Sequence, residues 1–215
     1  MVHAGAWLAD GRSLIMSITH MSHMLTSETE GWSEIAKKHP TAGRLLLYLV
    51  APMSLLPPLM YAYSEAVNPG AVFPLSVPAI SGFQLLVTGV VLFVVQLVMV
   101  SFMAGIIQRM SMARDHDPGY ENAYVLAAIA PVPLWLSSLA LFVPSLAFNL
   151  IVVAAAWVAS VALIRHGVRP MLRVDDAMKS RYIANMVVMA GVAAWIGLMV
   201  VSAAILSMLL GWWVV

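Results

Sequence analysis

The distribution of charge along the chain constrains the fold more than any other feature. Four long stretches contain no Asp, Glu, Lys or Arg, namely 45–64, 66–108, 122–164 and 182–215. A helix needs about 20 apolar residues to cross the hydrocarbon layer of a bilayer, and an ionised group inside that layer is costly. We therefore predict an all-α, polytopic membrane protein whose charged residues mark the ends of its spans.

Composition supports this prediction and excludes other classes of protein. Hydrophobic residues make up 62% of the chain and charged residues only 10%, whereas about a quarter of a soluble domain is charged. The net charge of +1, with no basic run among aromatic residues, argues against a nucleic-acid partner. The absence of cysteine excludes disulfides and thiolate metal sites.

Helix breakers divide the two longest uncharged stretches. Pro69, Gly70 and Pro74 precede the second helix, and Pro144 separates the third from the fourth. A re-entrant segment at 67–80, giving six membrane segments, is the alternative. Within a membrane domain of residues 41–215, we predict a bundle of five spans at about 44–64, 83–108, 122–143, 145–165 and 185–211.

The positive residues are one-sided. All 11 Lys and Arg lie before the first span, between the second and third, or between the fourth and fifth. Positive residues beside membrane helices are retained in the cytoplasm. We therefore expect the N terminus to be cytoplasmic and the C terminus to lie on the opposite side.

The fourth connection is the most basic segment and is expected to contact lipid headgroups. Each of its side chains would attract anionic lipid by about 1 kcal/mol, although a role limited to fixing topology is equally compatible with it. The helix would present 165, 169 and 173 as one stripe if it continued, and Pro170 argues against continuation. The predicted headgroup contacts are Arg165, Arg169, Arg173, Lys179 and Arg181.

Residues 1–40 are expected to form a cytoplasmic segment of amphipathic surface helices. Apolar residues spaced as Leu14, Ile18, Met21 and Leu25 line one side of a helix that could lie on the membrane, and a second short helix ends before Pro40. Two histidines, 20 and 23, occur there among methionines, residue types that copper accepts. Solvated histidines are the simpler interpretation, and we predict no metal and no cofactor.

Prolines mark a second candidate site, a set of helix kinks that could act as a gate. A proline frees a backbone carbonyl and bends its helix, and broken helices often border transporter sites. The spans contain no ionisable group that could carry a proton. The prolines concerned are Pro52, Pro57 and Pro58 in the first span and Pro131 and Pro133 in the third.

The uncharged polar and small residues of the spans have a plainer expected role. Side chains such as Gln96 and Ser160 are expected to form hydrogen bonds between helices. Small residues of the last span, Gly191 and Ala194 among them, predict close helix packing.

The segment 130–139, with the sequence APVPLWLSSL and followed by Pro144, resembles the Yip1 family, particularly its small bacterial inner-membrane members. Residues 170–181 and the region from Trp32 to 56 are similar to other parts of that family. The resemblance implies a five-helix bundle with a cytoplasmic N-terminal segment. Eukaryotic relatives associate with Rab-type GTPases and act in membrane traffic and membrane shaping. The resemblance supplies no catalytic residue.

These observations predict a non-enzymatic protein of the bacterial inner membrane. It would organise lipid or partner proteins at its basic cytoplasmic face, with membrane lipids, a protein partner or a second copy of the chain as its contacts. One alternative is a small transporter or channel gated at the proline kinks. Another is an enzyme acting on lipid through Asp115, His116 and Asp117.

Overall fold

The computed structural model describes residues 31–32, 35–36, 40–69, 81–113 and 117–209, and all the regular structure within them is helical. Its five helices long and apolar enough to cross a membrane are Ala42–Val67, Gly82–Met112, Tyr120–Phe142, Leu146–Leu172 and Ala177–Ile205. The predicted all-α fold with five spans is thereby confirmed. The predicted surface helix at 14–25 and most of the segment at 67–80 lie outside the described residues.

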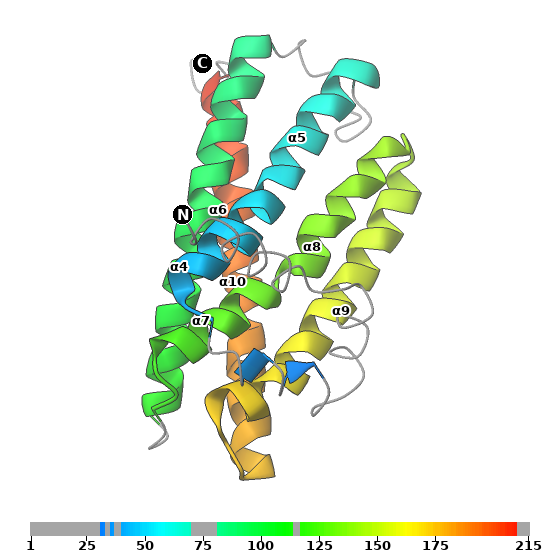
Figure 1. The fold of residues 1–215 in the computed structure, drawn as a ribbon. Helices are drawn as coiled ribbons and strands as arrows, with labels where there is room; N and C mark the ends of the chain where they lie inside the picture. The colour runs from blue at the N-terminus through cyan, green and yellow to red at the C-terminus, as the bar shows by residue number, and fades with distance from the viewer. Residues whose placement is uncertain (1–30, 33–34, 37–39, 70–80, 114–116, 210–215) are drawn as a thin grey trace, which may run out of the picture.

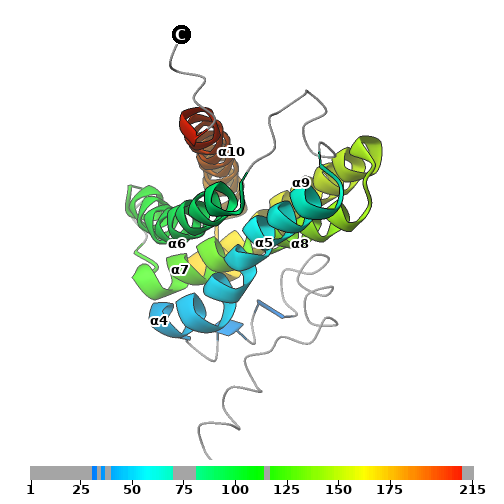
Figure 2. The same cartoon turned by 90° about the horizontal axis from the view of Figure 1, so that it is seen from above.

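The spans cross the bundle in alternating directions (Figure 1). The first consists of α4, a π-helical turn η1 and α5, and the third consists of α7, α8 and a 3-10 turn η2. Seen from above, α6 and α10 stand on one side of the bundle, and α5, α8 and α9 stand on the other (Figure 2). The bounds are α4 Ala42–Leu45, η1 Leu46–Val50, α5 Ala51–Val67, α6 Gly82–Met112, α7 Tyr120–Ile129, α8 Val132–Ser137, η2 Ser138–Phe142, α9 Leu146–Leu172 and α10 Ala177–Leu209.

The densest packing surrounds α7. Every residue from Ala123 to Ile129 is buried, because α4, α6 and α9 all pack against this helix. Its alanines allow those neighbours to approach closely. This end of the bundle therefore holds the core, whereas the opposite end is more open.

Trp32 joins this core from outside the spans. The side chain is fully buried against Gly167 of α9, and Leu126 of α7 approaches the same glycine. A Cβ atom built on Gly167 would lie only 2.6 Å from the Trp32 ring. The close approach therefore requires glycine at this point of α9.

Two spans are interrupted at prolines. The π-turn η1 lies just before Pro52, which has no N–H to donate to the carbonyl of Tyr48. In the third span α7 ends at Ile129 and α8 begins at Val132, because Pro131 cannot bond to the carbonyl of Ala127. Each interruption leaves carbonyl groups without their helical partner.

α9 continues past Pro170 to Leu172, contrary to the expectation that this proline would stop it. The proline lies in the last turn, so it removes only the bond to the carbonyl of His166. Arg173 then ends the helix in the left-handed conformation, and its N–H donates to the carbonyl of Arg169.

Candidate functional site

The side of α6 that faces outward ends in an arginine. Exposed apolar side chains recur along it every three or four residues, from Phe83 through Val90 and Val98 to Phe102. Such a stripe on a membrane span contacts lipid. Arg109 is exposed two helical turns beyond Phe102, on the same side of the helix.

The other spans that face lipid repeat this pattern. Along the first span, in η1 and α5, the exposed positions 48, 52, 55 and 59 continue back to Arg44 of α4. On α9 the exposed Val158 is followed two turns later by Arg165. On α10, Arg181 precedes the exposed Asn185 and Met189 on one side of the helix.

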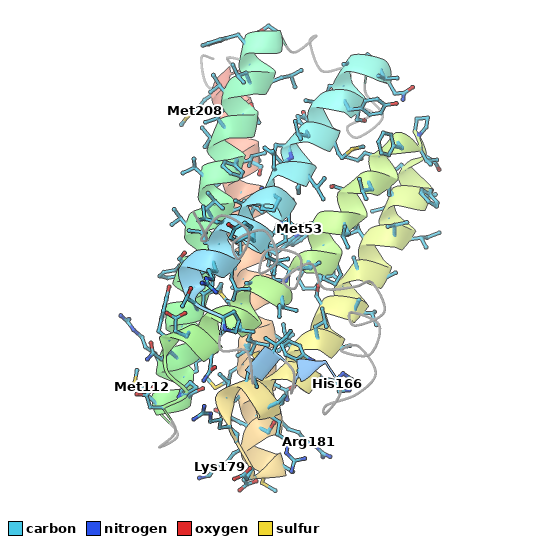
Figure 3. The ribbon with its side chains drawn as sticks, viewed as in Figure 1. Met53, Met112, His166, Lys179, Arg181 and Met208 are labelled. Carbon is cyan, nitrogen blue, oxygen red and sulfur yellow. The ribbon has the colours of Figure 1, made fainter. Side chains whose placement is uncertain are left out.

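These four residues, Arg44, Arg109, Arg165 and Arg181, are called the arginine rim here. They lie toward one end of the bundle: α6 and α9 finish there and α10 begins there, whereas α4 begins higher, beside the start of α7 (Figure 1). Figure 3 shows Arg181 and Lys179 at this end together with Met112, with Met208 at the other end. α6 and α10 have 31 and 33 residues, about 46 and 50 Å. Both therefore exceed a hydrocarbon layer of about 30 Å and extend beyond it.

The structure places the five predicted headgroup contacts on the surface of this end. Arg165 and Arg169 share one side of α9, and all five side chains are exposed. An Nη2 atom of Arg169 donates to the carbonyl of Asp175 at 3.3 Å. Sequence reasoning omitted Arg44 and Arg109 from this set. Arg109 could have been identified from its seven-residue spacing to Phe102, which places both residues on one side of the helix.

Asp176 organises the start of α10 at the same end. Its carboxylate accepts hydrogen bonds from the N–H groups of Met178 (2.7 Å) and Lys179 (3.2 Å), and its carbonyl accepts the N–H of Ser180. This is the geometry of a helix N-cap. The backbone hydrogen bonds from Lys179 and Met178 hold the pKa of Asp176 below its ordinary value.

We expect Asp176→Ala to lower the thermal midpoint at neutral pH, because two backbone donors lose their acceptor. The pKa is lower in the folded chain, so the contribution is present above the ordinary pKa and fades as pH falls through the folded one. The midpoints of wild type and variant, measured in mild detergent from neutral to acidic pH, should therefore converge in acid. A constant difference would contradict the capping role.

The predicted kink prolines occupy three different environments. Pro52 is exposed on the side of the first span that faces lipid, and Pro58 is buried near Gly89. Pro57 and Pro131 line the same cavity, which has a volume of about 300 Å³. Pro133 lies in the first turn of α8, outside that lining. The fold therefore brings together two of the five prolines.

A hydrogen-bonded clamp stands beside this cavity. The indole N–H of Trp135 donates to Oε1 of Gln96 at 2.8 Å, and Nε2 of Gln96 donates to the carbonyls of Ser54 and Leu92, both at 3.2 Å. Ser54 precedes Pro58 by four residues, so its carbonyl is the one that Pro58 leaves without a helical partner. The Gln96 clamp thus joins α5, α6 and α8 and satisfies a carbonyl freed by proline.

A model of the Yip1 domain matches residues 22–198 of the chain. The chain belongs to the Yip1 family. The matched region of this Yip1 protein contains the arginine rim, both proline-broken spans and the Gln96 clamp. Comparison with curated proteins and with solved structures gives no match.

The family and the five apolar helices together establish a multi-pass membrane protein of the Yip1 type. Its exposed apolar stripes contact membrane lipid. Asp115, His116 and Asp117 were considered as a lipid-processing site. Of these, Asp117 accepts hydrogen bonds from the backbone N–H of Gly119 and from the side-chain amide of Gln108. These bonds shape the turn before α7. Residues 115 and 116, and the histidines at 20 and 23, lie outside the described residues.

Proposed function

We propose that this Yip1 protein is a non-enzymatic organiser of anionic lipid at the cytoplasmic face of the bacterial inner membrane. Segment 1–40 and the arginine rim lie in the cytoplasm, residues 41–215 form the membrane domain, and the C terminus lies in the periplasm. The positive-inside rule supports this orientation, because every Lys and Arg flanks the same ends of the spans.

The observation that carries the proposal is the position of the rim arginines. Each one continues an exposed stripe that faces lipid: Arg109 and Arg165 follow their stripes, and Arg44 and Arg181 precede theirs. An arginine can lay its aliphatic stem along the apolar surface and hold its guanidinium among phosphates. Since the four arginines come from different spans, anionic headgroups would be gathered around the bundle rather than at a single point.

Protein partners would use the same cytoplasmic face. Exposed positive side chains at positions 169, 173 and 179 lie closer to the helix ends than Arg165 and Arg181 do. There they could meet an acidic segment of another protein. A second copy of the chain would meet the apolar stripes inside the membrane. Chemical cross-linking in native membranes distinguishes these two kinds of contact. Cross-links at the basic residues would indicate a protein partner, and cross-links between apolar stripes would indicate a second copy of the chain.

Replacing Arg44, Arg109, Arg165 and Arg181 together with glutamine should sharply reduce the enrichment of phosphatidylglycerol around the protein. Each lost arginine removes about 1 kcal/mol of attraction, close to fivefold in local lipid ratio at low salt. The measurement is the ratio of phosphatidylglycerol to phosphatidylcholine that remains with the protein after extraction from mixed vesicles.

Lysine replacements at the same four positions provide the matched control. They keep the charge, so the enrichment of anionic lipid should persist, and salt should reduce it in both wild type and the lysine variant. Unchanged enrichment in the glutamine variant would refute the proposal.

A transporter is the second candidate, because Pro57, inside α5, and Pro131, at the break in the third span, line the same cavity. None of the described residues that line the cavity is charged, so the lining favours an apolar cargo over an ion or a sugar. The Gln96 clamp ties two of the broken helices together and opposes their separation. Transport of a labelled lipid between leaflets of reconstituted vesicles would support this candidate.

A further inference from the structure

The cavity beside the Gln96 clamp is long and narrow. It has a volume of about 300 Å³, and it is lined along α6 between Leu92 and Ile107 and along α10 between Val187 and Ser202. Each segment advances fifteen residues, which corresponds to about 22 Å of helix. A narrow space of this length suits one extended hydrocarbon chain better than a compact ligand.

The walls of the cavity are almost entirely apolar. Met99, Met103 and Met199 contribute flexible thioethers that adapt to an irregular chain. Trp157 and Trp195 pack edge to face, with ring centroids 5.4 Å apart, and close the space between α9 and α10. A water molecule needs about two to four polar partners, and these walls offer only Gln96, Ser160 and Ser202 among mainly apolar side chains. Hydrocarbon is therefore the expected filling.

The cavity has access to the hydrocarbon layer. Met199 lines it and is also 43% exposed, so the lining reaches the outer surface of α10 at this residue. α10 packs mainly on α6 and α9, and it stands apart from α5 and α8 when the bundle is seen from above (Figure 2). None of the most apolar part of α10 is buried. A lipid chain could therefore enter sideways without passing through the core around α7.

One polar group in the cavity has no partner. Ser160 is only 5% exposed and lines the cavity, and its hydroxyl makes no hydrogen bond. An unpaired polar group in an apolar site is destabilising until it gains a hydrogen-bond partner. The amide of Gln96 cannot relieve it, because that amide already bonds to Trp135, Ser54 and Leu92.

The depth of Ser160 matches a lipid ester. Ser160 precedes Arg165 of the rim by five residues, so it lies about 7–8 Å deeper along α9. In a phospholipid the ester carbonyls also lie deeper than the phosphate and are joined directly to the acyl chains. An ester carbonyl beside Ser160 would accept a hydrogen bond from its hydroxyl, and the attached acyl chain would continue into the apolar cavity.

We propose that the cavity binds one acyl chain of a membrane phospholipid, with an ester carbonyl accepting a hydrogen bond from Ser160. The site is separate from the arginine rim. The rim gathers headgroups by charge, whereas the cavity takes one chain out of the bilayer and holds it between α6, α9 and α10. One retained phospholipid per protein is the direct consequence.

Gly191→Leu tests the cavity. Gly191 lines it, and a Cβ atom added there meets nothing within 4 Å, so the new side chain would fill space that the lipid chain needs. Native mass spectrometry of the full-length protein in mild detergent should show one bound phospholipid in wild type. The bound fraction should fall about tenfold or more in the variant, because a leucine displaces several methylene groups. Ala194→Leu fills the same cavity from the next turn and should act alike.

Gly197→Leu is the matched control. Gly197 also lies on α10 with open space around its Cβ position, but it does not line the cavity, so the bound phospholipid should remain. For the polar contact, Ser160→Ala should reduce retention severalfold. Ser111→Ala, which removes a hydroxyl that is also buried and unpaired but outside the cavity, should not.

Several results would overturn the inference. Wild-type protein that retains no lipid, or retains only a free fatty acid, contradicts it, as does a filled variant that keeps its phospholipid. The glutamine variant of the arginine rim should still retain one phospholipid. Failure of the rim proposal and failure of the cavity proposal are therefore distinguishable in the same set of proteins.

Discussion

Gly167→Leu is expected to lower the free energy of unfolding by about 2–3 kcal/mol, because the new side chain would overlap the Trp32 ring and Leu126. A Cβ atom alone would lie 2.6 Å from Trp32 and 2.8 Å from Leu126, closer than atoms in a packed core approach. The segment that contains Trp32 would therefore be released from α7 and α9. The thermal midpoint in mild detergent and the accessibility of Trp32 to an aqueous quencher measure the two effects.

Gly105→Leu controls for the change of residue type. Gly105 is also inside a long helix, and a Cβ atom there meets nothing within 4 Å. Both variants gain the same helix propensity, so the difference between them reports the contact with Trp32. Shortening Trp32 to alanine should remove much of the penalty at Gly167. Equal midpoints for the two leucine variants would contradict the close packing described here.

Gln96→Leu is expected to destabilise the fold by about 2–3 kcal/mol. The variant would leave the indole N–H of Trp135 and the carbonyl of Ser54 without partners in an apolar environment. The free energy of unfolding, measured by denaturant titration in mixed micelles, reports the loss. We also expect weaker attachment of α5 to α8, since the clamp joins both helices to α6.

Pro58→Ala provides a specific rescue. Alanine restores an N–H at position 58 that can donate to the Ser54 carbonyl within the helix, so this carbonyl no longer needs Gln96. Gln96→Leu should therefore be less harmful in the Pro58→Ala background than in wild type. Trp135→Phe should also reduce the effect of Gln96→Leu, because phenylalanine has no indole N–H that would be left without an acceptor. Strict additivity of Gln96→Leu and Pro58→Ala would show that Gln96 does not serve the freed carbonyl.

The number of spans and the helical class were predictable because a bilayer imposes them locally. Each uncharged stretch had to cover the hydrocarbon layer with hydrogen-bonded backbone, and a helix achieves this within one segment. The breakers at 69–78 and at Pro144 then divided the long stretches. The Yip1 resemblance rested on the proline-rich segment at 130–139, and the family match includes that segment.

The arrangement of polar groups required the tertiary structure. Gln96 was expected to form hydrogen bonds between helices, and it does so. Its partners, Ser54 in α5 and Trp135 in α8, are 42 and 39 residues away in the chain, and the sequence did not identify them. Those pairings depend on how each span is rotated about its axis. The sequence pattern leaves this rotation open, because apolar residues cover every side of a membrane helix. For the same reason it did not foresee that Ser160 would have no partner.

The sequence by itself determined five membrane helices and the grouping of the positive residues in alternate connections between them, because an ionised side chain is costly inside the hydrocarbon layer. Only the tertiary structure decided that Gly191 and Ala194 line a cavity instead of packing closely, and that α9 continues past Pro170. Both outcomes depend on the distance of α10 from its neighbours and on the contacts around the last turn of α9. Such contacts join residues far apart in the chain, so no local pattern records them.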